Sequence, residues 1–326
     1  MALLEVKDLV IDIPTEAGVL HAVSGISFSL ERGETLAIVG ESGSGKSLTS
    51  LALMDLLPKR AQRKAAKISF DGNDLTTISQ SGMRKLRGNR MAMIFQEPMT
   101  SLNPAYTIGD QLMEALTCHR KVSAKEARDR AIHLLEKVGI TAADRRLGQY
   151  PHQLSGGLRQ RVMIAMALMC GPDLIIADEP TTALDVTIQA QILHLIADLQ
   201  KEFGMAVILI THDLGVVARV ADKVGVMYAG RLVETGAARA VFKHPRHPYT
   251  RGLLDCIPVP GRTVPGMPLG AIRGQVPNLI GKLEGCAFRN RCDFAGPECA
   301  GEIAIAHPEP EHDVRCVRMP VLEASA

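Results

Sequence analysis

Tryptophan is absent from the 326-residue chain, and aromatic residues make up only 3% of it. This scarcity argues against a nucleic-acid-binding surface built from stacked aromatic side chains. An excess of charge is also missing, because 37 lysine and arginine residues face 35 aspartate and glutamate residues, a formal net charge of +2. A chain so balanced lacks a broad basic surface for phosphate backbones. We therefore expect no nucleic-acid partner.

Long apolar runs are missing too. The best candidates, residues 162–170 and 205–210, fall short of the roughly 18 apolar residues that a membrane-spanning helix needs. Glu5, Lys7 and Asp8 stand where a secretory signal would have its apolar segment. We expect a cytoplasmic location, where the seven cysteines stay reduced. The 46% of hydrophobic residues is ordinary for a folded protein with an aliphatic core.

Composition divides the chain near residue 243, because 11 of the 18 prolines and five of the seven cysteines follow that point. Before it, apolar and alternating runs predict strands, and helical spacing predicts helices. The predicted strands are 3–12, 26–31, 36–39, 174–177 and 207–210, and the predicted helices are 47–57, 108–116, 124–138 and 188–202. The sequence thus predicts an α/β domain over residues 1–242, with an antiparallel β lead-in and a helical subdomain at about 97–165. A loop-rich extension follows over 243–326.

A phosphate-binding loop, G-x-x-x-x-G-K-S, stands between the apolar run 36–39 and the predicted helix. Its residues are Gly40, Glu41, Ser42, Gly43, Ser44, Gly45, Lys46 and Ser47. Glycines let backbone N–H groups curl around an anion, and the start of the helix adds its positive dipole end. Lys46 is suited to the β- and γ-phosphates, and the Ser47 hydroxyl is suited to Mg²⁺. The loop predicts nucleotide binding.

Two carboxylates, Asp178 and Glu179, end the apolar run 174–177. A strand tip beside a phosphate loop needs one carboxylate for Mg²⁺ and another to polarise water. We assign the first role to Asp178 and the second to Glu179. His212 follows the apolar run 207–210 and is predicted to contact the γ-phosphate.

A second anion-binding element is predicted where Ser155, Gly156 and Gly157 precede a long helical pattern. One nucleotide does not need two such elements from one protomer. The economical explanation is a head-to-tail dimer, in which the Ser155 loop of each chain closes over the nucleotide held by its partner.

Together these segments resemble the ATP-binding subunit of an ABC transporter, and the resemblance covers residues 1–240. It implies a P-loop ABC-type nucleotide-binding domain. Gln96 would be the Q-loop glutamine, which binds Mg²⁺ and senses the membrane subunit; Asp185 would belong to a D-loop at 183–185. The signature segment would comprise Leu154, Ser155, Gly156, Gly157 and Gln160. Glu179 would be the catalytic base, with His212 positioning the γ-phosphate.

One departure concerns the adenine base. The family usually places an aromatic residue ahead of the phosphate loop, but residues 19–23 contain neither tyrosine nor phenylalanine. His21 is a candidate for stacking, and Leu20 or Ile13 for apolar contact, so the adenine contact stays unassigned.

Residues 95–104, 179–189 and 244–250 narrow the resemblance to the ATPases of dipeptide and oligopeptide permeases, whose close relatives include nickel importers. The resemblance implies an ATPase using ATP and Mg²⁺ to power peptide uptake. It also implies two membrane permease subunits, a second and different ABC ATPase subunit, an extracytoplasmic solute-binding protein, and a peripheral place on the cytoplasmic face of the membrane. Alternatives are import of nickel or another solute, a soluble ABC ATPase without a transport role, and a redox-sensing regulator.

Four cysteines in the extension, Cys286, Cys292, Cys299 and Cys316, are spaced C-x5-C-x6-C-x16-C. Four thiols in a segment with little apolar material suggest a metal site that helps it fold. An iron–sulfur cluster, [4Fe–4S], has no obligatory spacing, whereas structural zinc sites usually carry close cysteine pairs that are missing here. A similar cysteine-bearing tail occurs in the resembling permease ATPases. The cluster is preferred, with zinc and free thiols as alternatives. We interpret His244 and His247 as turn residues rather than a metal pair.

Overall fold

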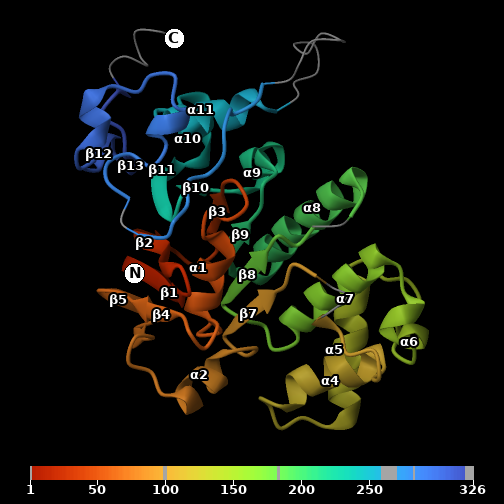
Figure 1. Ribbon diagram of the computed structural model, residues 1–326. Coiled ribbons are helices and arrows are strands. Elements are labelled where there is room, and N and C mark those ends of the chain that lie inside the picture. Colours follow the sequence, from red (N-terminus) through yellow and green to blue (C-terminus); the bar gives the residue numbers. More distant parts are fainter. Residues whose placement is uncertain (1, 98–100, 182–183, 258–269, 282, 320–326) are drawn as a thin grey trace. The chain divides into compact units, whose positions relative to one another are not determined.

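The computed structural model describes residues 2–97, 101–181, 184–257, 270–281 and 283–319. The chain forms two compact units. The first comprises residues 1–30, 35–76 and 211–326, and the second comprises 31–34 and 77–210. Each unit is described separately below, and both are drawn in Figure 1.

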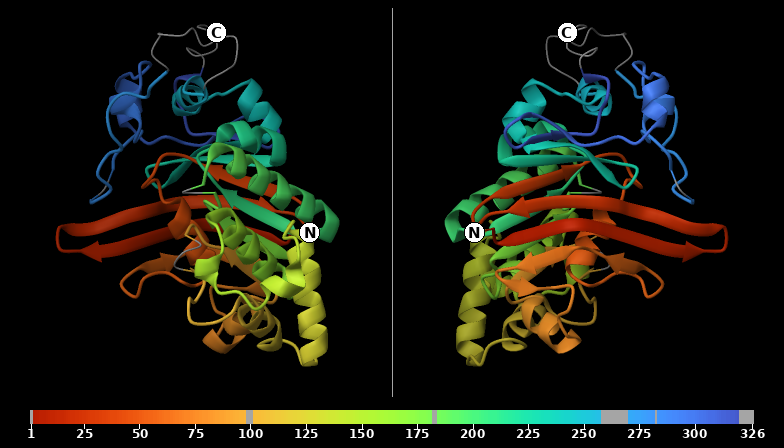
Figure 2. Two further views of the ribbon diagram at one scale, coloured as in Figure 1. Left: turned by 90° about the vertical axis from the view of Figure 1, so that its right-hand side faces the viewer. Right: turned by 90° about the vertical axis from the view of Figure 1, so that its left-hand side faces the viewer.

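In the first unit, the N-terminal residues form a long antiparallel ribbon (Figure 2). Strand β1 (Leu4–Thr15) pairs with β2 (Gly18–Leu30), and the order of the sheet is β2-β1-β5-β6, with β4 also on β1. The other strands are β4 (Gln62–Lys64), β5 (Lys67–Phe70) and β6 (Asn73–Asp74). This confirms the predicted antiparallel lead-in, although its two strands are longer than predicted.

The same unit contains a second set of strands, in the order β12-β13-β11-β10-β3. They are β3 (Thr35–Val39), β10 (Lys223–Tyr228), β11 (Arg231–Ala237), β12 (Ala306–Glu309) and β13 (His312–Val314). All five residues of β3 are buried, and it pairs in parallel with β10. Its continuous apolar sequence is the pattern of a strand covered on both faces.

Among its described residues, this unit has four α-helices: α1 (Lys46–Leu53), α9 (Leu214–Val220), α10 (Ala238–Lys243) and α11 (Pro248–Asp255). Helix α1 is shorter than the predicted 47–57. It ends because Met54 caps it and Asp55 takes a positive φ of 52°, which turns the chain out of the helix.

The C-terminal extension packs into the first unit rather than standing apart. Its β13 pairs with β11, and its two short 3₁₀ helices are η2 (Arg289–Arg291) and η3 (Pro297–Ala300). Phe288 and Tyr249 pack on Tyr228 of β10, with ring centroids 5.2 and 4.6 Å from the Tyr228 ring. The apolar contact that docks the extension therefore uses three of the chain's few aromatic side chains.

In the second unit, the parallel strands β7 (Met91–Ile94), β8 (Leu174–Asp178) and β9 (Ala206–Ile210) run in the order β9-β8-β7. Every residue of β8 and β9 is buried. Between these two strands the chain forms α8 (Val186–Phe203), which ends at Gly204 with φ 65°. The predicted strand–helix–strand segment is confirmed, because β8 and β9 are parallel neighbours.

The described part of this unit also contains the helices α2 (Gln80–Leu86), α4 (Ile108–Thr117), α5 (Ala124–Lys137), α6 (Ala143–Arg146), the 3₁₀ helix η1 (Pro151–Gln153) and α7 (Gly156–Leu168). Capping boxes fix two of their starts: Thr107 with Asp110 on α4, and Ser123 with Glu126 on α5. Helices α4, α5 and α7 pack on one another, as Figure 1 shows. They correspond to the predicted helical subdomain.

No helix in the part of the chain that the structure describes is long and apolar enough to cross a membrane.

Candidate functional site: a phosphate loop, a catalytic edge and a signature helix

The phosphate loop connects β3 to α1, as the sequence predicts. At Gly40, a Cβ atom would lie 2.1 Å from the Met227 carbonyl oxygen; at Gly45, it would lie 2.5 Å from the Ala22 carbonyl oxygen. Both glycines also have positive φ, 153° and 104°. The two positions therefore require glycine because backbone from β10 and β2 approaches the loop closely.

Lys46 is only 4% exposed, and its side chain folds back over the loop. Its Nζ donates hydrogen bonds to the carbonyl oxygens of Gly40 (2.9 Å) and Glu41 (3.0 Å). This geometry holds the ammonium group next to the loop backbone. A phosphate oxygen could there accept a hydrogen bond from Nζ in place of one of these carbonyl oxygens. Ser44 Oγ is buried without a hydrogen-bond partner among the described residues, so the loop carries a polar atom available to a ligand.

The second unit places the acidic pair at the end of β8. Asp178 is 5% exposed and is the last residue of that strand. Glu179 follows with a positive φ of 43°, and its N–H donates to the Ile210 carbonyl oxygen of β9 (2.9 Å). Gln96, just after β7, donates from Nε2 to Glu179 Oε2 (3.1 Å). The structure thus brings together Gln96 and Glu179, a contact that the sequence analysis did not predict.

His212 lies in the first unit, is exposed, and follows β9 by two residues. Its predicted contact with the γ-phosphate stays a prediction, as does the joint magnesium site of Ser47, Gln96 and Asp178.

The signature segment begins α7. Ser155 is its N-cap, with Oγ accepting from the Leu158 N–H (3.4 Å). Ser155 and Gly156 are exposed, so the start of this 13-residue helix faces solvent and can meet an anion of a partner chain. Leu154 and Gln160 are buried, and Gln160 Nε2 has no hydrogen-bond partner among the described residues.

Parts of two predicted segments lie outside the described residues: Pro98, Met99 and Thr100 of segment 95–104, and Ala183 of the D-loop together with Thr182 before it. Asp185 itself is described and exposed at the N-cap of α8, without a side-chain cap hydrogen bond.

The edge of β2 is occupied by the extension. Leu279 accepts from the His21 N–H (2.9 Å), and the Gly281 N–H donates to Val19 (3.1 Å). The His21 ring is held by Asp12, at 2.7 Å from Nδ1 to Oδ1. The ring therefore already has a partner. The adenine contact remains unassigned.

The four cysteines of the extension line one narrow pocket, and none forms a disulfide. Burial raises the pKa of Cys286 and of Cys292, and it raises the pKa of Cys316 to about 11. In the described part of the chain, no three His, Cys, Asp or Glu side chains are arranged around one metal ion.

His247 lies at the bend before α11, and its side chain also has a structural role that the sequence did not indicate. It is 1% exposed and is the N-cap of α11, where its Nδ1 accepts from the Tyr249 N–H (3.1 Å). Burial lowers the pKa of His247 to about 4, so the ring is neutral at pH 7.

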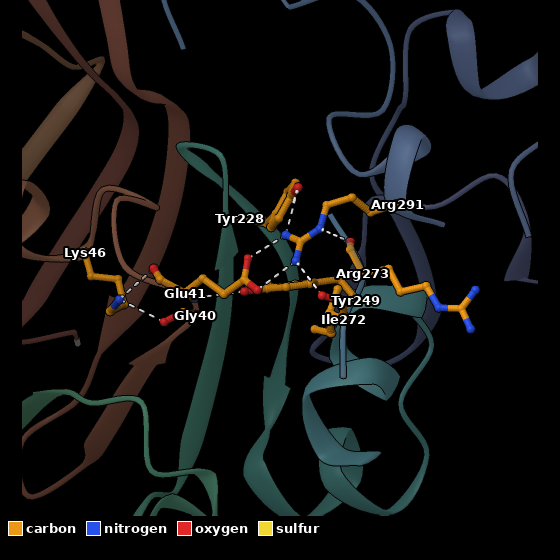
Figure 3. A network of polar contacts seen from close by, with 8 residues as sticks. All are labelled: Gly40, Glu41, Lys46, Tyr228, Tyr249, Ile272, Arg273 and Arg291. Atoms are coloured by element: carbon orange, nitrogen blue, oxygen red, sulfur yellow. Dashed lines mark hydrogen bonds and ion pairs between the residues drawn. The ribbon is translucent and has the colours of Figure 1, made fainter. Parts of the chain in front are cut away.

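Sequence reasoning missed one further contact of the phosphate loop. Arg291 of the extension forms an ion pair with Glu41, and Tyr249 accepts the Glu41 N–H, as Figure 3 shows. Arg291 is one of two arginines between Cys286 and Cys292, and neither belongs to a motif that would have identified this contact.

Comparison with known proteins decides the family. Residues 23–182 match the family model described as ABC transporter, and residues 233–299 match that of the oligopeptide/dipeptide transporter C-terminal region. The chain is 51% identical over 302 residues to the dipeptide transport ATP-binding protein DppD of Escherichia coli, covering 93% of this chain and 92% of that protein. The chain belongs to the ABC transporter ATP-binding proteins.

Other relatives agree with this assignment. The oligopeptide transport ATP-binding protein OppD of Bacillus subtilis is 54% identical over 294 residues, which cover 90% of this chain and 82% of that protein. Among solved structures, the ATP-binding cassette MJ0796, a dimer in a post-hydrolysis state bound to ADP and phosphate, matches with a TM-score of 0.64. It is 26% identical and covers 72% of this chain and 99% of its own. The predicted α/β ABC-type fold is confirmed.

Proposed function

We propose that this chain is the ATP-hydrolysing subunit of an ABC importer that takes up dipeptides or oligopeptides across the cytoplasmic membrane. The proposal rests mainly on how much of the chain is similar to known peptide transport proteins. About half of the residues are shared with dipeptide and oligopeptide transport ATP-binding proteins, over both the ATPase region and the C-terminal region. A likeness confined to the ATPase region would support only a general ATPase.

The residues of the site suit in-line hydrolysis of ATP. Lys46 and the N–H groups of the phosphate loop would hold the triphosphate, and Ser47, Gln96 and Asp178 would supply oxygen ligands for Mg²⁺. When bound, Mg²⁺ neutralises charge on the β- and γ-phosphates. Glu179 accepts a proton from water as the water oxygen bonds to the γ-phosphorus, and the bond from that phosphorus to the bridging oxygen of ADP breaks. His212 positions the γ-phosphate.

Within this chain, the hydrogen bond from Gln96 to Glu179 offers a route for coupling. While Gln96 donates to it, the Glu179 carboxylate is held in one orientation and one of its oxygens is occupied. Movement of Gln96 toward Mg²⁺ would release the base. Contact of residues near Gln96 with a membrane subunit would then control hydrolysis.

The exposed Ser155 helix start requires a partner nucleotide. We propose that a second, related ATPase subunit supplies it, with Leu154, Gly156, Gly157, Gln160 and Asp185 at the interface. The solved dimer of the similar cassette MJ0796 supports this arrangement. Two permease subunits, a solute-binding protein outside the cell and a peripheral position on the cytoplasmic face complete the proposed transporter.

For the cysteine pocket, we propose a [4Fe–4S] cluster held by Cys286, Cys292, Cys299 and Cys316. All four residues line the same pocket, and an all-thiol donor set suits iron–sulfur ligation. Among the described residues no three ligand side chains are arranged around one metal ion, so the preference for iron–sulfur over zinc rests on the cysteine spacing, which lacks the close pairs of structural zinc sites. Such a group, when bound, would cross-link a segment of short 3₁₀ helices and loops. Iron and sulfide in anaerobically purified protein would support the cluster; zinc alone, or free thiols, would refute it.

Uptake in cells tests the transport proposal. Cells whose chromosomal copy is replaced by Glu179→Gln should lose uptake of labelled dipeptide and keep uptake of nickel. Loss of nickel uptake with dipeptide uptake intact, in cells lacking a redundant peptide importer, would instead indicate a nickel importer. Glu136→Gln, which changes an exposed carboxylate on α5, is the matched control.

A further inference from the structure

The side chain of Glu41, the second residue of the phosphate loop, is bound by the C-terminal extension. Arg291 Nη1 lies 2.6 Å from Glu41 Oε2, and Nη2 lies 2.9 Å from Oε1. The Arg291 side chain is 5% exposed and the Glu41 side chain 29% exposed. This is a two-pronged charge-assisted contact with little competition from water, the strongest form of hydrogen bonding between side chains.

Other groups fix the guanidinium before any nucleotide arrives. Arg291 Nε donates to the Arg273 carbonyl oxygen (2.8 Å), and its two terminal nitrogens also reach the Ile272 carbonyl oxygen (3.2 Å) and the Tyr228 hydroxyl (3.3 Å). The guanidinium lies over the rings of Tyr228 and Phe288, 5.7 and 5.8 Å from their centroids. Figure 3 shows the side chain fixed in this network. Little side-chain entropy remains to be lost when it holds Glu41.

The backbone of Glu41 is bound at both ends of the residue. Its N–H donates to the hydroxyl of Tyr249 on α11 (2.9 Å), and its carbonyl oxygen accepts from Lys46 Nζ (3.0 Å). Glu41 therefore connects the extension directly to the lysine that the proposed function assigns to ATP.

A carboxylate in a loop that binds a triphosphate is a liability, because like charges repel strongly where water is scarce. We propose that Arg291 is a positioning residue of the nucleotide site: it neutralises Glu41 and holds the phosphate loop in its binding conformation, which makes the C-terminal extension part of that site. This inference rests on the proposed ATP-binding function. The segment between Cys286 and Cys292, which carries Arg291, thereby sets the electrostatic potential at the phosphate loop.

The test is the affinity of the full-length chain for a fluorescent ATP analogue and its ADP counterpart. Arg291→Ala should raise the Kd for the ATP analogue about tenfold, which corresponds to the loss of one charge-assisted hydrogen bond. The Kd for the ADP analogue should rise by a smaller factor. Adding Glu41→Gln to Arg291→Ala should restore most of the affinity, because the uncompensated charge is then gone. Arg291→Lys, which keeps the charge but loses the two-pronged contact, should give a Kd between those of the wild type and Arg291→Ala.

Arg289→Ala is the matched control. Arg289 lies in the same segment but donates to the Glu284 carbonyl oxygen (3.0 Å), within the extension. The Arg289→Ala variant should therefore have the same Kd for the ATP analogue as the wild type. If Arg291→Ala does not purify folded, Arg291→Gln takes its place, since it removes the charge and keeps a polar side chain.

The results separate this inference from the proposed function. Failure of the wild-type chain to bind ATP would overturn the proposed function. Wild-type binding that Arg291→Ala leaves unchanged would overturn the inference alone. A weakened Arg291→Ala that Glu41→Gln does not restore would also overturn it, because a merely structural arginine gives that result.

Discussion

Alanine at Gly45 should destabilise the fold much more than alanine at Gly43 in the same loop. Gly43 and Gly45 both have positive φ, 77° and 104°. A Cβ at Gly43 meets nothing within 4 Å, whereas at Gly45 it lies 2.5 Å from the Ala22 carbonyl oxygen and 2.8 Å from Met227 Cε. The pair therefore separates backbone conformation from close packing.

The magnitudes follow from these contacts. A positive φ costs alanine about 1–2 kcal/mol, which both variants should show. Gly45→Ala should lose about 1–3 kcal/mol more, the usual cost of forcing atoms into a packed site. The assay is urea denaturation of the full-length chain, with the free energy of unfolding of each variant compared with the wild type.

Equal free energies of unfolding for Gly43→Ala and Gly45→Ala would refute the packing argument. That result would mean that β2 does not press on the phosphate loop as described. A larger loss for Gly43→Ala would refute it more strongly.

Three further predictions concern stability. Glu234→Ala should cost about 3 kcal/mol in urea denaturation, because the fully buried Glu234 accepts from His312 Nε2 (2.9 Å), which would be left buried without its partner; a loss under 1 kcal/mol would contradict this. The unfolded chain binds a proton at His247 near pH 6.5 and the folded chain only near pH 4, so stability should fall by up to about 3 kcal/mol as the pH drops from 6.5 to 4. His247→Asn, which keeps an N-cap but does not titrate, should flatten that slope, and an unchanged slope would argue against His247 as its source. Ser155→Ala should lose up to about 1 kcal/mol of protection at the start of α7 in hydrogen exchange, since Oγ no longer accepts from the Leu158 N–H; unchanged exchange there would contradict a capping role.

The parts of the fold that the sequence predicted are those fixed by local pattern. The apolar runs that became β3, β8 and β9 could be read because buried parallel strands are apolar throughout. The glycines of the phosphate loop could be predicted because the loop conformation requires glycine at fixed positions. The helices α4 and α5 followed from their apolar spacing.

Contacts between residues far apart in the chain could not be predicted from the sequence. Strand β13 pairs with β11 across some 80 residues but is only three residues long, and its four-residue partner β12 is largely exposed, so neither gives a strand pattern that can be recognised in the sequence. The Arg291–Glu41 pair joins residues 250 positions apart. The prolines around His247 correctly indicated a turn, but its burial against Phe288 and its capping of α11 depend on packing within the extension, which the sequence does not show.

The most direct test of the central claim is ATP hydrolysis by the transporter purified with this chain and reconstituted into lipid vesicles. Dipeptide and the solute-binding protein are added outside the vesicles, and the ATPase faces their interior, which corresponds to the cytoplasm. The addition should stimulate hydrolysis and cause dipeptide to accumulate inside. Glu179→Gln should abolish both while ATP remains bound. A rate of hydrolysis that does not change when dipeptide is added would contradict this function. So would peptide transport by the Glu179→Gln variant.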